Sequence, residues 1–130
     1  FKNDSIMKKL LILLFSMLIS FNSYGEWTEV ASGNSIIFHI DFDTVKENNG
    51  FIYYWTLSNR IKPNSDGNLS SKVLREGNCK TPIKYRGISW HYYKLPMGEG
   101  NPESNSLVGD WNYPIPGSVG KSLIEAACNM

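Results

Sequence analysis

The chain has 130 residues, of which 13 are basic and 12 acidic, and its formal net charge is +1. A chain of this length forms one domain with a modest core. Because the charges nearly cancel, no global charge would attract nucleic acid, and we expect no nucleic-acid partner. No catalytic or cofactor motif is complete, so we expect neither an enzyme nor a cofactor.

Residues 1–25 are predicted to be a leader that is not part of the fold. Lys8 and Lys9 precede an apolar run over residues 10–19, and Ser23-Tyr24-Gly25 offers small residues for a cleavage site. The run is shorter than the roughly 20 residues that a membrane-spanning helix needs. We therefore expect a cleaved signal peptide and no integral membrane segment in the mature chain.

The mature chain is expected to be a single domain over residues 26–130, with Met7 as the start of translation. Without the leader, 10 basic and 11 acidic residues remain, which gives a formal net charge of −1. No cysteine lies in the leader or just after it, so there is no signal for a lipoprotein anchor. We expect an exported protein that is periplasmic or secreted.

Alternating apolar and polar residues predict strands over residues 27–31, 35–41 and 51–61. In the second of these strands, the alternation places three apolar side chains on one face, namely Ile36, Phe38 and Ile40. In the third, the odd-numbered positions are uniformly apolar or aromatic, so we expect these side chains to meet the core: Phe51, Tyr53, Trp55 and Leu57.

The next segments predict a hairpin of two strands, over residues 69–79 and 83–93. Gly87 inside the second strand indicates a bulge. Residues 94–108 are rich in Gly, Pro, Asn and Ser and are expected to form a long irregular loop. A last short strand is predicted over residues 109–113.

Residues 118–128 carry the only long helical pattern outside the leader. Ser118 can cap the first turn, and an apolar stripe follows at helical spacing: Val119, Leu123, Ile124 and Ala127. We expect this helix to cover a sheet, which predicts an α+β domain. Residues 117–122 imitate half of a phosphate-binding loop, but Ile115 stands where that motif needs glycine, so no nucleotide site is expected.

Cys79 and Cys128 are the only cysteines, and in an exported chain they most simply pair. Such a disulfide closes a loop of about 50 residues and contributes roughly 4 kcal/mol on the chain-entropy model. The alternative is a metal site that includes His39 and His91, but these four positions show no ligand spacing.

His39, Asp41 and Asp43 form a second candidate metal site, because a strand would place all three on one face. An exported metal-binding protein or enzyme that uses these residues is therefore the alternative function. The competing interpretation is a solvated strand face, with Asp43 capping a helical turn over residues 43–47.

A basic segment follows between residues 72 and 94, where Glu76 is the only acid. Its cations are Lys72, Arg75, Lys80, Lys84, Arg86 and Lys94. Strand alternation places Lys84 and Arg86 on one face, whereas Lys72 and Arg75 cannot share a face. The candidate ligand-binding residues are Lys72, Lys80, Lys84 and Arg86, which suit an anionic partner unless they merely solvate the sheet.

An ordered set of residues also carries a family resemblance. In the first part of the mature chain these are Trp27, Ile40-Asp41, Gly50, Trp55-Thr56-Leu57, Ser70-Ser71-Lys72, Glu76, Cys79, Tyr85-Arg86 and Tyr92-Tyr93. In the second part they are Met97-Gly98-Glu99-Gly100, Trp111-Asn112-Tyr113, residues 116–120, Leu123 and Cys128. This set resembles the bacterial surface-adhesin protein E family over essentially the whole mature chain. The chain departs from the family in its loops and at Lys121, where an acidic residue is expected.

The resemblance implies an antiparallel sheet of about six strands, flanked by the C-terminal helix and tied to it by the Cys79–Cys128 disulfide. It further implies a non-enzymatic binding domain of Gram-negative bacteria, whose sheet surface engages a host extracellular-matrix or cell-envelope protein or a glycan. Dimerisation is known in the family, so a homodimer is a further expectation. Without a lipid-anchor signal, surface display does not follow from the resemblance.

Overall fold

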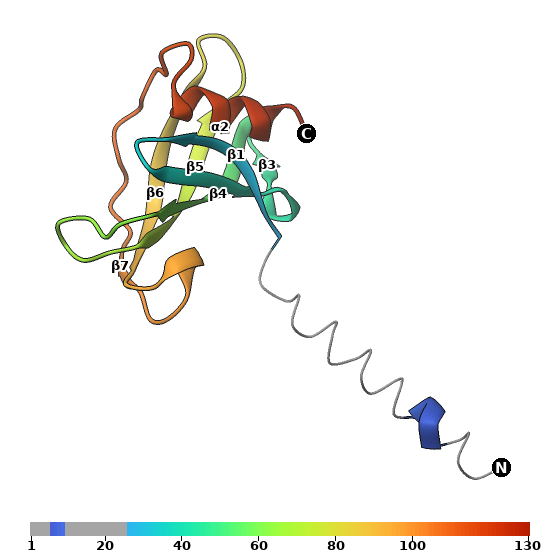
Figure 1. Cartoon of the computed structure of the whole chain (residues 1–130). Helices are drawn as coiled ribbons and strands as arrows, with labels where there is room; N and C mark the ends of the chain where they lie inside the picture. Colours follow the sequence, from blue (N-terminus) through green and yellow to red (C-terminus); the bar gives the residue numbers. More distant parts are fainter. Residues whose placement is uncertain (1–5, 10–25) are drawn as a thin grey trace.

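The computed structural model of the protein describes residues 6–9 and 26–130 (Figure 1). The predicted leader lies almost entirely outside the described residues. From residue 26 onward the chain forms one antiparallel sheet and a C-terminal helix, which confirms the predicted α+β class. Among the described residues, no helix is long and apolar enough to cross a membrane.

The sheet has seven strands, of which five are long and two have only three residues each. In chain order they are β1 (Trp27–Gly33), β2 (Ile36–Asp41), β3 (Lys46–Asn48), β4 (Phe51–Arg60), β5 (Ser70–Asn78), β6 (Lys84–Tyr93) and β7 (Glu103–Asn105). The helix is α2 (Val119–Cys128), and two short 3-10 turns are η1 (Phe42–Thr44) and η2 (Pro96–Gly98).

The strand order is β1-β2-β4-β5-β6-β7, and β3 pairs with β4 beside β2. Strands β2 and β3 together therefore act as one interrupted partner of β4, with η1 between them. Asp41, not Asp43, caps η1, because its carboxylate accepts a hydrogen bond from the Asp43 amide (3.2 Å). The predicted helical turn over residues 43–47 is wrong, since Lys46 and Glu47 already belong to strand β3.

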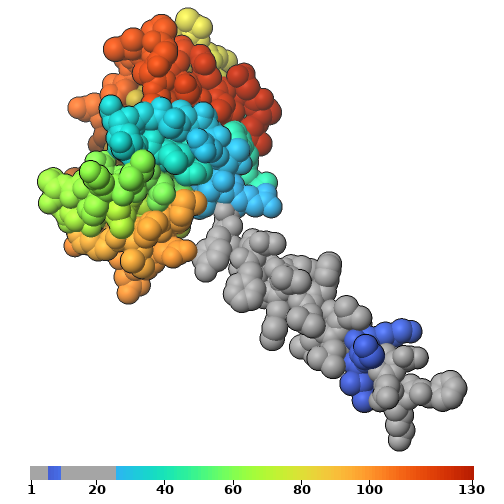
Figure 2. All heavy atoms as spheres, in the orientation of Figure 1, coloured from blue at the N-terminus to red at the C-terminus, as the bar shows by residue number. Residues whose placement is uncertain are grey.

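Helix α2 lies across one face of the sheet, as Figure 1 shows. In Figure 2 the atoms of the helix meet those of β1 and β2 along a continuous surface. The core at this contact consists of buried side chains from both layers: Ile40, Tyr54, Leu123, Ile124 and Ala127. The helix starts as predicted, with the Ser118 hydroxyl accepting a hydrogen bond from the Lys121 amide (3.2 Å).

The face of β4 that meets this core is opposite to the predicted one. Tyr54 and Ile52 pack in the helix-facing core, so the odd-numbered side chains of β4 point to the other side. Phe51, Tyr53 and Trp55 remain half-buried there, and only Leu57 is fully buried. The prediction failed because both faces of β4 carry large apolar residues, and the position of α2 decides between them.

Gly77 allows the helix to lie close to β5. A Cβ atom at this position would come 2.8 Å from Ile124 Cδ1 and 3.3 Å from Ile52 Cγ2. The missing side chain thus leaves room for a fully buried isoleucine of the helix. A bulge between Leu74 and Arg75 in the β5–β6 pairing lies opposite Gly87, where the sequence predicted one.

The outer edge of β6 is closed by short pieces of the segment that leads to α2. Strand β7 pairs with residues 90–92, and Asn112 exchanges two backbone hydrogen bonds with Tyr85 (3.0 and 2.8 Å). Gly109 donates a third hydrogen bond to the Gly87 carbonyl (2.9 Å). The predicted strand over residues 109–113 is therefore a single bridge, and the predicted irregular loop contains both η2 and β7.

Cys79 and Cys128 form the predicted disulfide, with a sequence separation of 49. Cys79 follows the last residue of β5 and Cys128 ends α2, so the bond ties the end of the helix to the sheet. The apolar stripe packs along the length of the helix, and the covalent link fixes its C-terminal end.

Replacing both cysteines by serine should lower the stability of the fold. On the chain-entropy model the loss is about 4 kcal/mol, because the denatured chain regains the freedom of a loop of about 50 residues. In a domain of this size the thermal midpoint should fall by about 15–30 °C. Thermal melts followed by circular dichroism, before and after reduction of the wild-type protein, measure it. Two titratable thiols in the unreduced folded protein would contradict the bond.

Candidate functional site

The sheet face that α2 leaves uncovered is the candidate functional surface, and we call it the open face. It carries aromatic and charged side chains from every long strand. They include Trp27, Trp55, Tyr53, Lys72, Glu76, Lys84, Arg86, His91 and Tyr93. The last contributor, Trp111, comes from the segment that precedes the helix.

An ion pair lies in the middle of the open face. Arg86 Nη2 is 2.7 Å from Glu76 Oε1, and Arg86 Nε donates to the same oxygen at 2.9 Å. The Tyr53 hydroxyl donates to Glu76 Oε2 at 2.7 Å, and this hydrogen bond raises the pKa of Tyr53. The side chain of Glu76 is only 12% exposed, so its carboxylate depends on these two donors.

Trp111 covers the two cations of β6 on this face. Its ring stacks on Phe51 at a centroid distance of 5.8 Å. Lys84 Nζ lies 4.3 Å from the ring centroid and Arg86 Cζ lies 4.1 Å from it. These distances are within the range of cation–π attraction, so the indole orders both cations.

Beside this cluster the open face is hollowed into a cleft of about 370 Å³. Its lining residues are Trp27, Asp41, Thr44, Trp55, Lys72, His91 and Tyr93. Lys72 Nζ lies 5.8 Å from the Trp27 ring and 5.3 Å from the Tyr93 ring. The cleft therefore combines aromatic surface with a cation that two rings hold in place.

Two hydroxyls orient His91 at the edge of the cleft. Its Nδ1 lies 2.6 Å from Ser104 Oγ and its Nε2 lies 2.8 Å from Ser89 Oγ. The Trp55 and His91 rings are 5.7 Å apart, which gives the cleft a continuous aromatic wall. Both ring nitrogens already have partners, so His91 serves the cleft as a fixed surface.

The structure brings three of the four predicted ligand-binding residues to the open face: Lys72, Lys84 and Arg86. Lys80 lies instead in the β5–β6 turn, where its amide donates to Asn78 Oδ1 (3.1 Å). Arg75 faces the helix side, as strand alternation predicted for one of the pair Lys72 and Arg75. The binding role of these four residues remains a prediction.

The alternative metal site does not form. Within the described residues, no group of three or more His, Cys, Asp or Glu side chains could hold a metal ion. His39 is buried at 9% exposure, whereas Asp41 is committed to capping η1. Asp43 lies beyond the strand, inside the 3-10 turn, so the three residues do not share one strand face.

Sequence reasoning did not place the tryptophans of the open face. Trp111 reaches the open face from far along the chain, and no local pattern indicates this contact. Trp55, by contrast, lies on the same face of β4 as Tyr53. If the even-numbered face of β4 had been predicted as the core face, Trp55 would have been expected on the open face.

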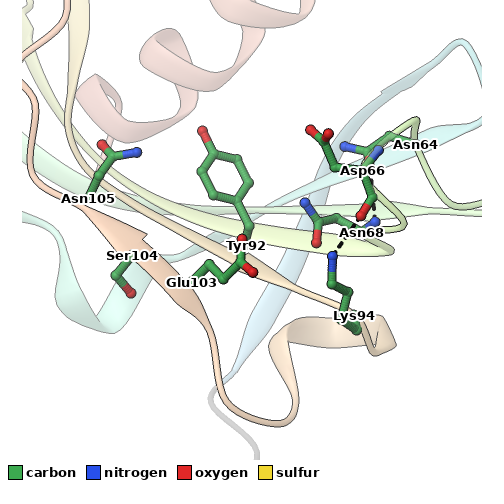
Figure 3. A pocket seen from close by; sticks show the side chains of 8 residues that line it. All are labelled: Asn64, Asp66, Asn68, Tyr92, Lys94, Glu103, Ser104 and Asn105. Atoms are coloured by element: carbon green, nitrogen blue, oxygen red, sulfur yellow. Dashed lines mark hydrogen bonds between the residues drawn. The ribbon is translucent and has the colours of Figure 1, made fainter.

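A second concavity, which we call the polar recess, lies between the β4–β5 connection and β7 (Figure 3). It measures about 610 Å³ and is lined by Asn64, Asp66, Asn68, Tyr92, Lys94, Glu103, Ser104 and Asn105. In Figure 3 the Tyr92 ring stands between Asn105 on one side and the residues of the β4–β5 connection on the other.

The rim of the polar recess is fixed by hydrogen bonds. Asn64 Oδ1 accepts from the amides of Asp66 (3.1 Å) and Asn68 (2.9 Å), which shapes the connection as a tight turn. Lys94 Nζ donates to the Asp66 carbonyl at 2.6 Å, which fastens this turn to the end of β6. Asn68 is 6% exposed, and its Oδ1 has no hydrogen-bond partner among the described residues.

A single sheet that is covered by a helix on one side and presents ordered aromatic and charged side chains on the other defines a small α+β domain suited to binding. The protein belongs to the surface-adhesin protein E family, because the sequence model of that family matches residues 27–129. Neither the curated proteins nor the solved structures contain a match to the chain. The family and the disulfide together indicate an exported, adhesin-like protein.

Replacing Arg86 by glutamine should destabilise the fold more than replacing Lys84. Without Arg86, the poorly exposed Glu76 carboxylate loses its cation, which costs about 1–3 kcal/mol. Lys84→Gln is the matched control, because Lys84 touches the same indole without a carboxylate partner, and its effect should stay within about 0.5 kcal/mol. Urea denaturation measures both free energies of unfolding, and equal losses would contradict the structural role of the ion pair.

Proposed function

We propose that the protein is a non-enzymatic binding domain whose open face engages an acidic segment of a partner protein. The observation that carries this proposal is that Lys72 and Lys84 lie on the open face without a carboxylate partner in the described part of the chain. Among the described residues, the ion pairs are Arg86–Glu76 and Lys121–Glu125, so these two lysines have no carboxylate of their own. Instead, aromatic rings hold them on the open face.

This arrangement suits a protein surface for physical reasons. Aromatic and arginine side chains are enriched where proteins bind each other, and rigid rings lose little entropy when they are covered. A cation that is ordered before binding also loses less freedom when an acidic side chain arrives. The adhesin family suggests that the partner is a host molecule, and an acidic matrix protein is the kind that these cations would attract.

The Arg86–Glu76 pair leaves Arg86 little free charge for a partner. We therefore assign attraction to Lys72 and Lys84, and assign to Arg86 the ordering of the surface between them. Lys80 extends the positive charge beyond the edge of the open face, from the β5–β6 turn. A homodimer, as occurs in the family, would be compatible with either face and remains a proposal.

The double change Lys72→Gln and Lys84→Gln should weaken capture of an acidic polypeptide about tenfold, since each exposed contact is worth roughly 1 kcal/mol or less. Immobilised poly-glutamate of defined length is the probe, read by surface plasmon resonance at two salt concentrations. The affinity of the wild type should fall with salt, because screening acts over about 8 Å at physiological strength.

Lys62→Gln with Lys121→Gln is the matched control, because it removes the same charge away from the open face. Equal binding by both double variants would show that only net charge matters and would refute the site. Capture of heparin but not of poly-glutamate would refute a protein partner in favour of an anionic glycan.

A second candidate function is the binding of a neutral saccharide in the polar recess. Its specific support is Asn68, whose buried Oδ1 lacks a donor that a sugar hydroxyl could supply. Amide and carboxylate groups bind hydroxyl pairs, and the Tyr92 ring offers a flat surface for a sugar ring. The two carboxylates outnumber the single cation, Lys94, which disfavours an acidic sugar.

Titration with glucose, galactose or N-acetylglucosamine should shift the amide resonances of the recess in two-dimensional NMR spectra. Tyr92→Ala should weaken the effect at least about tenfold if the ring stacks on the sugar. Tyr113→Ala, an exposed tyrosine outside the recess, is the control, and glycerol tests for unspecific polyol effects. Shifts that glycerol reproduces, or that survive Tyr92→Ala, would refute a saccharide site.

A further inference from the structure

A small pocket lies on the helix side of the sheet, separate from the open face and from the polar recess. It is lined by polar as well as apolar side chains, and the packing of the helix on the sheet does not require the polar ones. It measures about 220 Å³ and lies where the first turn of α2 crosses β2, β4, β5 and β6. Its lining residues are Phe38, Tyr54, Arg75, Tyr85, Val119, Gly120 and Leu123. We call it the inner pocket.

Arg75 is the only charged group that lines the inner pocket. Its Nε donates to Thr56 Oγ1 (3.2 Å), and its guanidinium lies 5.5 Å from the Tyr85 ring and 6.0 Å from the Trp90 ring. Within residues 26–130, no carboxylate lies within ion-pair distance of it. Removal from water lowers the pKa of Arg75 but leaves it charged at neutral pH.

A cation in such surroundings is costly unless something balances it. Aromatic faces compensate only part of the lost hydration, and an arginine taken out of water is normally paired with a carboxylate or phosphate. The contrast with Arg86 is direct, because that arginine has Glu76 on the opposite face of the same hairpin. The inner pocket therefore has an unbalanced positive charge.

Tyr54 gives an independent sign of a missing partner. Its side chain is 0% exposed, it lines the inner pocket, and its hydroxyl has no hydrogen-bond partner among the described residues. Burial raises the pKa of Tyr54, so the hydroxyl keeps its proton and can act only as a neutral donor or acceptor. A buried hydroxyl without a partner is rare and unfavourable, and an anion would use it as a donor.

The N-terminus of α2 adds to the positive electrostatic potential of the inner pocket. Val119 and Gly120 belong to the first turn of α2, whose free amides form the positive end of the helix dipole. The missing side chain at Gly120 lets this turn approach the Tyr85 hydroxyl, which any Cβ atom there would collide with. A charged side chain, a buried hydroxyl and a helix terminus thus all favour negative charge in one pocket.

The remaining lining selects the kind of anion. Phe38, Leu123 and Val119 are apolar, and the volume is below that of pockets for drug-sized ligands. Phe38, Arg75, Tyr85 and Val119 are each partly exposed, so the pocket has an open side. A phosphate would leave most of its oxygens against apolar surface, whereas a carboxylate attached to a small apolar body would match both parts.

We propose that the inner pocket binds a small organic monocarboxylate. Its carboxylate would lie against the Arg75 guanidinium and the Tyr54 hydroxyl, and its apolar body would pack on Phe38 and Leu123. Since Leu123 and Tyr54 also belong to the contact between helix and sheet, occupancy would stabilise the folded domain.

Three probes of the wild-type protein separate the parts of this proposal. Benzoate carries both charge and ring, benzyl alcohol keeps the ring without the charge, and acetate keeps the charge without the ring. Benzoate should raise the thermal midpoint in a concentration-dependent manner and shift the resonances of the first turn of α2. Equal effects of benzyl alcohol, or no effect of benzoate at concentrations where the protein stays folded, would overturn the proposal.

The variant Tyr54→Phe tests the assigned hydroxyl without removing the ring from the core. It should weaken benzoate binding about tenfold, because it removes one hydrogen bond to a charged group. The free protein should be no less stable, because the lost hydroxyl had no partner. A merely structural hydroxyl would leave benzoate affinity unchanged, which would overturn the assignment.

Arg75→Lys and Arg75→Met complete the test. Lysine keeps the charge but loses the planar pair of donors and should bind benzoate more weakly, and methionine should abolish the difference between benzoate and benzyl alcohol. Tyr113→Phe is the matched control for Tyr54→Phe, since Tyr113 is exposed and lies outside the pocket. Should Arg75→Met fail to fold, Tyr54→Phe still decides the proposal.

Discussion

The architecture depends on the fact that one helix of ten residues can bury only one face of a seven-stranded sheet. The helix side holds the apolar core, so the open face must be ordered by contacts among its own side chains. It achieves this with rings, cations and one carboxylate. Residues that resemble core in the sequence, such as Phe51 and Trp55, thereby form a surface that is both rigid and accessible.

Two arginines on adjacent strands of one hairpin illustrate how charge is distributed in this fold. Arg86 has Glu76 and an indole, whereas Arg75 has rings and a hydroxyl but no carboxylate among the described residues. A count of basic residues between positions 72 and 94 treats them alike. The informative quantity is the charge that remains after ion pairing, and in this segment only Arg86 has a carboxylate partner within the part of the chain that the structure describes. The remaining positive charge lies on Lys72, Arg75, Lys80, Lys84 and Lys94.

The long strands, the helix, its cap at Ser118 and the disulfide could be predicted because each depends on a local pattern or on the pairing of two cysteines. The three-residue strands β3 and β7 were not predicted. Strand alternation also placed Lys84 and Arg86 on one face. The face of β4 that is buried could not be predicted, since both faces are apolar and a helix some 60 residues away decides between them. The contact of Trp111 with Phe51 was out of reach for the same reason: it is long-range.

The closure of β6 by β7 and by the backbone bonds of Gly109 and Asn112 has a consequence for self-association. A long bare outer strand would offer its amides and carbonyls to the strand of a neighbouring molecule and would promote fibre growth. Here those groups are occupied by scattered short partners, and at the other edge the register shift between Glu29 and Ala31 distorts β1. Crowding would therefore favour contacts through side chains rather than uncontrolled extension of the sheet.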